Sequence, residues 1–81
     1  MMKMLTVYTR NEPPCGYCLM AKTLLGHHGI DYKEVVIGED IDREEFRNKF
    51  PNIRTVPAIF TEEYIGGYQQ LEERIAEFTN G

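Results

Sequence analysis

Cys15-Gly16-Tyr17-Cys18 holds both cysteines of this 81-residue chain, with two residues between them. A segment with helical periodicity follows, so we expect Cys15 at the start of a helix, where the backbone amides favour a thiolate. Cys18 lies one turn further along the helix, placed to attack a mixed disulfide formed on Cys15. The spacing therefore indicates a site for thiol–disulfide exchange.

Size and composition limit what surrounds this pair. The 81 residues make a single domain, 1–81, and the apolar content of 42% indicates a globular fold. A net charge of −4 is unsuited to binding nucleic acid. No apolar run reaches the ~20 residues that span a bilayer. No signal peptide opens the chain, so we expect a cytoplasmic protein, whose reduced cysteines are catalytic or metal-binding.

The first half of the chain predicts a strand, a helix and a second strand. Residues 4–8 alternate in β-forming side chains, and two prolines mark residues 9–14 as a loop. Residues 18–28 predict a helix, and residues 30–37 predict the second strand. The helix rests on apolar residues at helical spacing, which are Leu19, Met20, Leu24 and Leu25. A single crossover makes the two strands parallel.

The second half predicts a short helix followed by a hairpin. The helix covers residues 42–49, with Asp40 or Asp42 as its N-cap. Residues 55–60 form a loop that leads into a third strand. Residues 64–65 form a fourth strand, which pairs with the third as a hairpin.

A last helix over residues 69–78 closes the chain. Its inner face carries three apolar residues, Leu71, Ile75 and Phe78. The order β-α-β-α-β-β-α is typical of an α/β domain. We expect a central, mixed, four-stranded sheet with helices on both faces.

Three short motifs, in this order and in a chain of this size, carry a family resemblance. They are the C-x-x-C at the head of the first helix, Thr55-Val56-Pro57, and Ile65-Gly66-Gly67-Tyr68. From Val7-Tyr8-Thr9 to the last helix the chain closely resembles the glutaredoxins, and its longer loop before Cys15 resembles those of large bacteriophages. The resemblance implies a thioredoxin-like fold and a monomer. It also implies glutathione-dependent reduction of protein disulfides and glutathione mixed disulfides, with ribonucleotide reductase among the protein substrates.

The resemblance assigns roles to individual residues. Cys15 is the nucleophile, Cys18 is the resolving thiol, and glutathione is the reductant. Val56, before a cis Pro57, pairs its backbone with the glutathione peptide, while Arg54 binds a carboxylate. The residues expected to contact glutathione are Arg10, Tyr17, Arg54, Thr55, Val56, Pro57, Gly67, Tyr68 and Gln69.

Plainer interpretations stand beside these roles. The arginines also fit solvated surface charges, Tyr17 fits an exposed aromatic, and Gly66-Gly67 fits an ordinary turn from hairpin to helix. The motifs depart from the family pattern in two places. Gly16 replaces the proline that usually follows the first cysteine. Gln69 and Gln70 stand where the family usually has aspartates, which removes one charged contact with glutathione.

Two other functions stay open. Some glutaredoxins without that proline hold a [2Fe–2S] cluster between two monomers, with glutathione supplying the thiolates that two protein cysteines cannot. Redoxins of this size can also take electrons from thioredoxin reductase instead of glutathione. A zinc site is not expected, because no other Cys or His has the spacing of zinc ligands.

Overall fold

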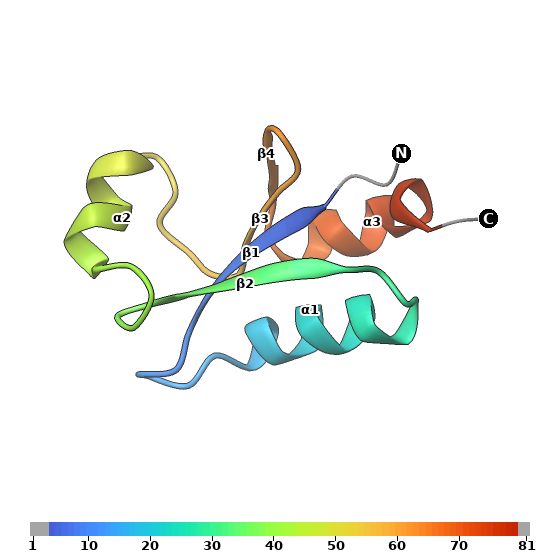
Figure 1. Cartoon of the computed structure of the whole chain (residues 1–81), viewed down its shortest axis with the longest axis horizontal. Helices are drawn as coiled ribbons and strands as arrows, with labels where there is room; N and C mark the ends of the chain where they lie inside the picture. The colour runs from blue at the N-terminus through green and yellow to red at the C-terminus, as the bar shows by residue number, and fades with distance from the viewer. Residues whose placement is uncertain (1–3, 80–81) are drawn as a thin grey trace.

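The computed structural model describes residues 4–79, which form one sheet with helices on both faces (Figure 1). The elements are β1 (Leu5–Arg10), α1 (Gly16–His27), β2 (Tyr32–Ile37), α2 (Arg43–Lys49), β3 (Ala58–Phe60), β4 (Tyr64–Gly66) and α3 (Tyr68–Phe78). The four strands lie in the order β2-β1-β3-β4, so the predicted α/β architecture is confirmed. Within residues 4–79, no helix has the length and apolar character needed to cross a membrane.

β1 is a central strand, and its alternation decides which side chains face which helices. It pairs in parallel with β2 and antiparallel with β3, and β4 adds antiparallel to β3. Successive side chains of a strand point to opposite faces. Val7 and Thr9 therefore point to the face covered by α1 and α3, whereas Tyr8 and Arg10 point to the face covered by α2.

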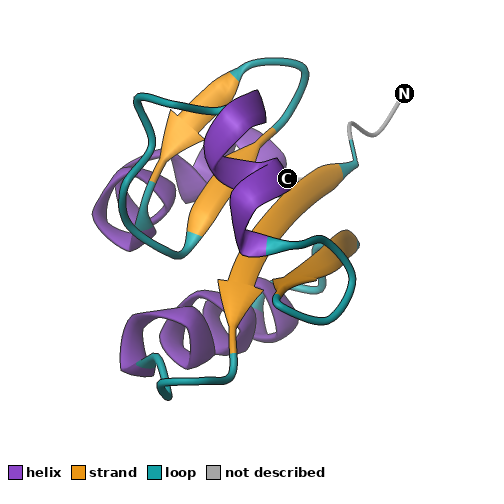
Figure 2. Cartoon of the chain, turned by 90° about the vertical axis from the view of Figure 1, so that its left-hand side faces the viewer, coloured by secondary structure: helices purple, strands orange, loops and turns teal. Residues whose placement is uncertain are grey.

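Each face of the sheet has its own hydrophobic cluster. On one face, Leu25 of α1 and Leu71 of α3 are fully buried against Val7 and Ile59, with Ile75 and Phe78 packed beside them as predicted. On the other face, α2 contributes an aromatic cluster, described below. Figure 2 shows the strands running between the helices of the two faces.

The aromatic cluster under α2 centres on Tyr8. Its ring lies 5.1 Å from the ring of Phe46 and 5.5 Å from that of Phe50. Phe60 packs on the same group, 4.8 Å from Phe50 between ring centroids. Aromatic pairs at these separations add to the burial energy, so they fix α2 over the same end of β1 that leads to Cys15.

The buried side of α1 differs from the one that its apolar residues suggested. Leu19 and Met20 are 64% and 45% exposed, whereas Cys18, Ala21 and Leu25 are buried. The buried positions follow the spacing of one helix face. A thiol and a small side chain, rather than the larger apolar residues, therefore meet the sheet at the start of α1.

Two strand ends differ from the prediction for reasons of hydrogen bonding. The first strand was expected over residues 4–8, but β1 continues to Arg10, which pairs with Ile37 in the ladder with β2. β2 begins two residues later than predicted. The reason is that the Ile30 N–H donates to Leu25 O and belongs to the turn that ends α1.

The helix starts also differ slightly from the prediction. α1 begins two residues earlier than expected, and α3 begins one residue earlier. Asp42 takes the N-cap position of α2, but its side chain makes no capping hydrogen bond. The carboxylate of Asp40 instead accepts the Val36 N–H at 2.9 Å, which stabilises the turn after β2.

Gly66, at the end of β4, occupies a position that suits only glycine. Its φ is +139°, and a Cβ there would lie 2.7 Å from Cγ of Gln70, whereas a Cβ on Gly16 would meet no atom within 4 Å. We expect Gly66→Ala to lower the free energy of unfolding by more than about 1 kcal/mol. Gly16→Ala should change it by less than about 0.5 kcal/mol. Urea denaturation measures both, and equal effects would contradict this account of β4.

Candidate active site

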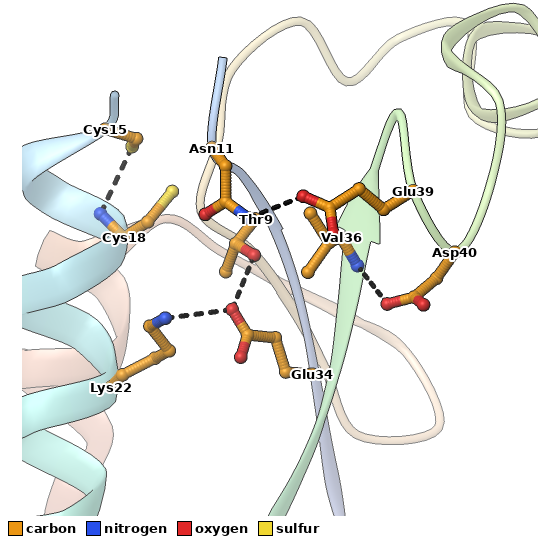
Figure 3. Close-up of polar contacts among 9 residues, drawn as sticks. All are labelled: Thr9, Asn11, Cys15, Cys18, Lys22, Glu34, Val36, Glu39 and Asp40. Atoms are coloured by element: carbon orange, nitrogen blue, oxygen red, sulfur yellow. Dashed lines mark hydrogen bonds and ion pairs between the residues drawn. The ribbon is translucent and has the colours of Figure 1, made fainter. Parts of the chain in front are cut away.

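Cys15 is the N-cap of α1, and the first turn of the helix holds its sulfur. The Cys18 N–H donates to Cys15 Sγ at 3.2 Å (Figure 3). The Leu19 N–H donates to Cys15 O at 3.3 Å. An N-cap side chain satisfies an otherwise unpaired amide of the helix, and the helix dipole favours a negative charge at the same place. The sulfur of Cys15 therefore lies at the backbone amides of the helix start, where an exchange reaction can begin.

Cys18, in contrast to Cys15, is buried. It is 3% exposed, and both cysteines are free thiols. Burial raises the pKa of Cys18 to about 12; the hydrogen bond with Cys15 adds to the increase, and the backbone and charge of Arg10 oppose it. Cys18 is therefore protonated at neutral pH, so only Cys15 can begin an exchange reaction.

The Thr55-Val56-Pro57 segment meets the active site at Val56. The Val56–Pro57 peptide bond is cis, as predicted, and Pro57 is buried. Cys15 Sγ, as a thiol, donates to Val56 O at 3.7 Å. A thiolate has no proton to donate, so ionisation of Cys15 leaves this carbonyl free to accept a hydrogen bond from an incoming peptide.

The start of α3 lies on the same part of the molecule. A Cβ on Gly67 would lie 3.5 Å from Pro57 O, which shows how closely the two backbones approach. The Tyr17 ring is 63% exposed, and its centroid lies 6.1 Å from that of Tyr68. Tyr17, Pro57, Gly67 and Tyr68, expected to share one site, are thus neighbours.

One contact changes what the start of α3 offers to a ligand. Oε1 of Gln70 accepts the Gly67 N–H at 2.9 Å, and the side chain of Gln69 is exposed. The sequence singled out both glutamines as departures from the family pattern but assigned a contact with glutathione to Gln69 alone. An anion that binds the Gly67 amide would have to displace the Gln70 side chain first, whereas the next amides of α3 are at the helix start, where anions bind.

Arg10 and Arg54 lie in an open groove of about 680 Å³, together with Thr55 and Val56. The Nε atom of Arg10 donates to Pro13 O at 3.0 Å, so the loop before Cys15 fixes this side chain. Gly67, Tyr68 and Gln69 do not line the groove. The expected glutathione residues therefore form two groups, with Val56 as the link to Cys15.

Sequence reasoning missed a polar cluster beneath the two cysteines. Oε2 of Glu34 accepts hydrogen bonds from Thr9 at 2.7 Å and from Lys22 at 3.0 Å (Figure 3). Burial alone would raise the pKa of Glu34, but these two donors outweigh it and lower the pKa. Lys22 lies four residues after Cys18, on the buried side of α1, which was the one available signal.

A half-buried thiol at the N-cap of a helix, a buried second thiol one turn later and a nearby cis-proline segment define a class of protein. The mixed sheet with α1 and α3 on one face and α2 on the other is the thioredoxin-like fold. Together the fold and the two thiols identify a thiol–disulfide oxidoreductase of the thioredoxin-like class.

Comparisons with known proteins narrow the class to a family. A model of the glutaredoxin family matches residues 5–65, and Glutaredoxin 3 of Escherichia coli K12 is 35% identical over 66 residues, covering 80% of this chain and 77% of its own. The chain belongs to the glutaredoxin family.

Solved structures give the same result. Glutaredoxin 1 from Francisella tularensis, complexed with cacodylate, superposes with a TM-score of 0.72 at 28% identity, covering 91% of this chain and 93% of its own. A buckwheat glutaredoxin–glutathione complex gives a TM-score of 0.75 at 26% identity, covering 90% and 68%.

The different environments of the two thiols predict different rates of alkylation. At pH 8 iodoacetamide should modify Cys15 and leave Cys18 intact, because the buried thiol is almost entirely protonated. In Cys15→Ser, Cys18 should react at least ~100-fold more slowly than a free cysteine. Mass spectrometry of timed samples, with the unfolded variant as control, measures both rates. Comparable reactivity of Cys18 in folded and unfolded Cys15→Ser would contradict its burial.

Proposed function

We propose that this protein is a glutathione-dependent thiol–disulfide oxidoreductase that reduces protein disulfides and glutathione mixed disulfides. One observation carries the proposal, the approach of Val56 O to Cys15 Sγ at 3.7 Å. It sets a strand-like backbone edge beside the nucleophile, which suits an extended peptide whose own sulfur must reach Cys15. Glutathione is such a peptide.

Reduction of a glutathione mixed disulfide needs only Cys15. Its thiolate attacks the glutathione sulfur, so a Cys15–glutathione disulfide forms, the protein–glutathione bond breaks, and the protein sulfur leaves as a thiolate that takes up a proton. The thiolate of a second glutathione attacks the glutathione sulfur bound to Cys15. Oxidised glutathione leaves, and the Cys15 thiolate is restored.

Reduction of a protein disulfide uses both thiols. Once Cys15 is in a mixed disulfide with the substrate, its sulfur has no negative charge. It also no longer accepts a hydrogen bond from Cys18 as a thiolate would. The contributions of Cys15 to the high pKa of Cys18 then disappear, while the effect of burial persists. Cys18 loses its proton and attacks Cys15 Sγ. The Cys15–Cys18 disulfide forms, the bond from Cys15 to the substrate breaks, and the substrate sulfur leaves as a thiolate that takes up a proton. Two glutathione molecules then reduce the Cys15–Cys18 disulfide.

Two features of the chain support glutathione as the reductant. The helix start at Tyr68 provides amides for one carboxylate, and Arg54 lies in the groove beyond Val56, where it suits the other. The related buckwheat protein is described as a glutaredoxin–glutathione complex. We propose the same ligand here, in preference to direct reduction by thioredoxin reductase.

The protein substrate and the compartment are part of the same proposal. The resemblance to dithiol glutaredoxins makes ribonucleotide reductase the protein substrate to test. A dithiol that acts as a reductant has to be kept reduced, so we propose the cytoplasm as its compartment.

A [2Fe–2S] cluster shared by two copies of the chain is the second candidate. The open space at Gly16 favours it, since no atom lies within 4 Å of where a Cβ would be. No group of three or more His, Cys, Asp or Glu side chains in residues 4–79 could hold a metal ion. The ligands would thus be Cys15 of each copy and two glutathione thiolates. Anaerobic purification with glutathione tests this candidate, and a colourless monomer would contradict it.

A glutathione-coupled assay with glutathione reductase and NADPH tests the main proposal. Wild type should reduce a glutathionylated peptide, and Cys15→Ser should retain less than about 1% of the rate. Cys18→Ser should keep the glutathionylated-peptide activity within about threefold and lose the reduction of an intramolecular protein disulfide. Full activity of Cys15→Ser, or activity with thioredoxin reductase but not with glutathione, would overturn the proposal.

A further inference from the structure

The groove beyond Val56 has an unusual concentration of positive charge. Although the chain has a net charge of −4, four of its five arginines line this one groove and no acidic residue does. We call it the arginine groove, and its arginines are Arg10, Arg43, Arg47 and Arg54. Like charges gathered in one concave surface repel each other and attract anionic ligands.

These four guanidinium groups are not neutralised within the described part of the chain. Among residues 4–79, the ion pairs are Lys22–Glu34 and Arg74–Glu77, neither of which is in the groove. Glu44 and Glu45 stand on α2 but do not line the groove. The positive charge of the arginine groove is therefore available to a partner.

The arginine groove carries more positive charge than the binding of glutathione requires. Glutathione carries two carboxylates, and the proposed function already gives one of them to the start of α3. A single carboxylate then remains for four arginines. Arg43 and Arg47 lie on α2, which Figure 1 shows at the same end of the molecule as the start of α1. They extend the positive surface from Val56 along α2, further than a tripeptide attached to Cys15 requires.

The groove also has apolar lining residues. Ile37, Phe46 and Ile53 line it together with the arginines. A charged pair near such a surface is less screened by water than one on a fully exposed surface. The arginine groove therefore suits an extended peptide segment that carries several carboxylates and one or two apolar side chains.

We propose that the arginine groove binds an acidic stretch next to the target cysteine of the protein substrate. This inference rests on the proposed function, because it requires that Cys15 attack a protein disulfide. Val56 lines the groove and its carbonyl contacts Cys15 Sγ, so a substrate sulfur at Cys15 brings the flanking residues of the substrate to the groove. The carboxylates speed encounter and orient the disulfide.

Matched disulfide peptides test the proposal in the glutathione-coupled assay. Each peptide contains one C-x-x-C disulfide flanked by three Glu, three Gln or three Lys residues, and hydroxyethyl disulfide serves as a small neutral substrate. Wild type should show a kcat/KM for the Glu peptide about tenfold above that for the Gln peptide. The Lys peptide should be the poorest, and the preference should shrink as salt rises from ~20 to ~200 mM.

A double variant inside the arginine groove and a control variant outside it show whether the preference for the Glu peptide arises in the groove. Arg43→Gln/Arg47→Gln should lower kcat/KM for the Glu peptide about 5- to 10-fold and change the values for the Gln peptide and hydroxyethyl disulfide less than about twofold. Arg74→Gln, which removes one positive charge from α3 outside the groove, should leave all of them unchanged.

The outcomes separate the inference from the proposed function. Equal rates for the three peptides would overturn the inference and leave the function intact. Equal loss on hydroxyethyl disulfide, or a higher KM for glutathione, in the double variant would also overturn it, because the groove would then serve glutathione alone. Absence of glutathione-dependent activity on hydroxyethyl disulfide in wild type would overturn the function itself.

Discussion

The hydrogen bond from the Cys18 N–H to Cys15 Sγ is the interaction on which the site depends. It exists because α1 begins at Gly16, which leaves Cys15 as the N-cap and places Cys18 one turn inside the helix. The same turn that exposes one sulfur to helix amides buries the other against the sheet. Two chemically identical side chains thus acquire different environments, and the order of the reaction follows from the burial that keeps Cys18 protonated.

The central strand links this helix start to the rest of the surface. Because β1 alternates, Thr9 joins the polar cluster with Lys22 beneath α1, while Arg10 faces the α2 side and the arginine groove. The loop after β1 then returns to Cys15. One strand therefore supports both the buried side of the dithiol and the charged surface that approaches it, and a change in its register would disrupt both.

Local motifs in the sequence predicted much of the fold and of the candidate site, whereas the remaining features depend on tertiary packing. The C-x-x-C, the cis Pro57 and the glycines before α3 depend on neighbouring residues, so the sequence indicated them. The burial of Cys18 in place of Leu19 depends on how α1 packs against the sheet. The spacing of apolar residues had predicted that Leu19 would be on the buried side. The grouping of Arg43 with Arg10 depends on α2 packing over β1, and no spacing in the sequence contains that information.

An extended thiol peptide bound to Cys15 should pair with the backbone of Val56. Amide hydrogen exchange measured by NMR on Cys18→Ser tests this pairing, with the free protein compared with its Cys15–glutathione mixed disulfide. The Val56 amide should become at least about tenfold more protected in the mixed disulfide, while amides of the distant His27–His28 segment should not change. An unchanged Val56 exchange rate would contradict the pairing.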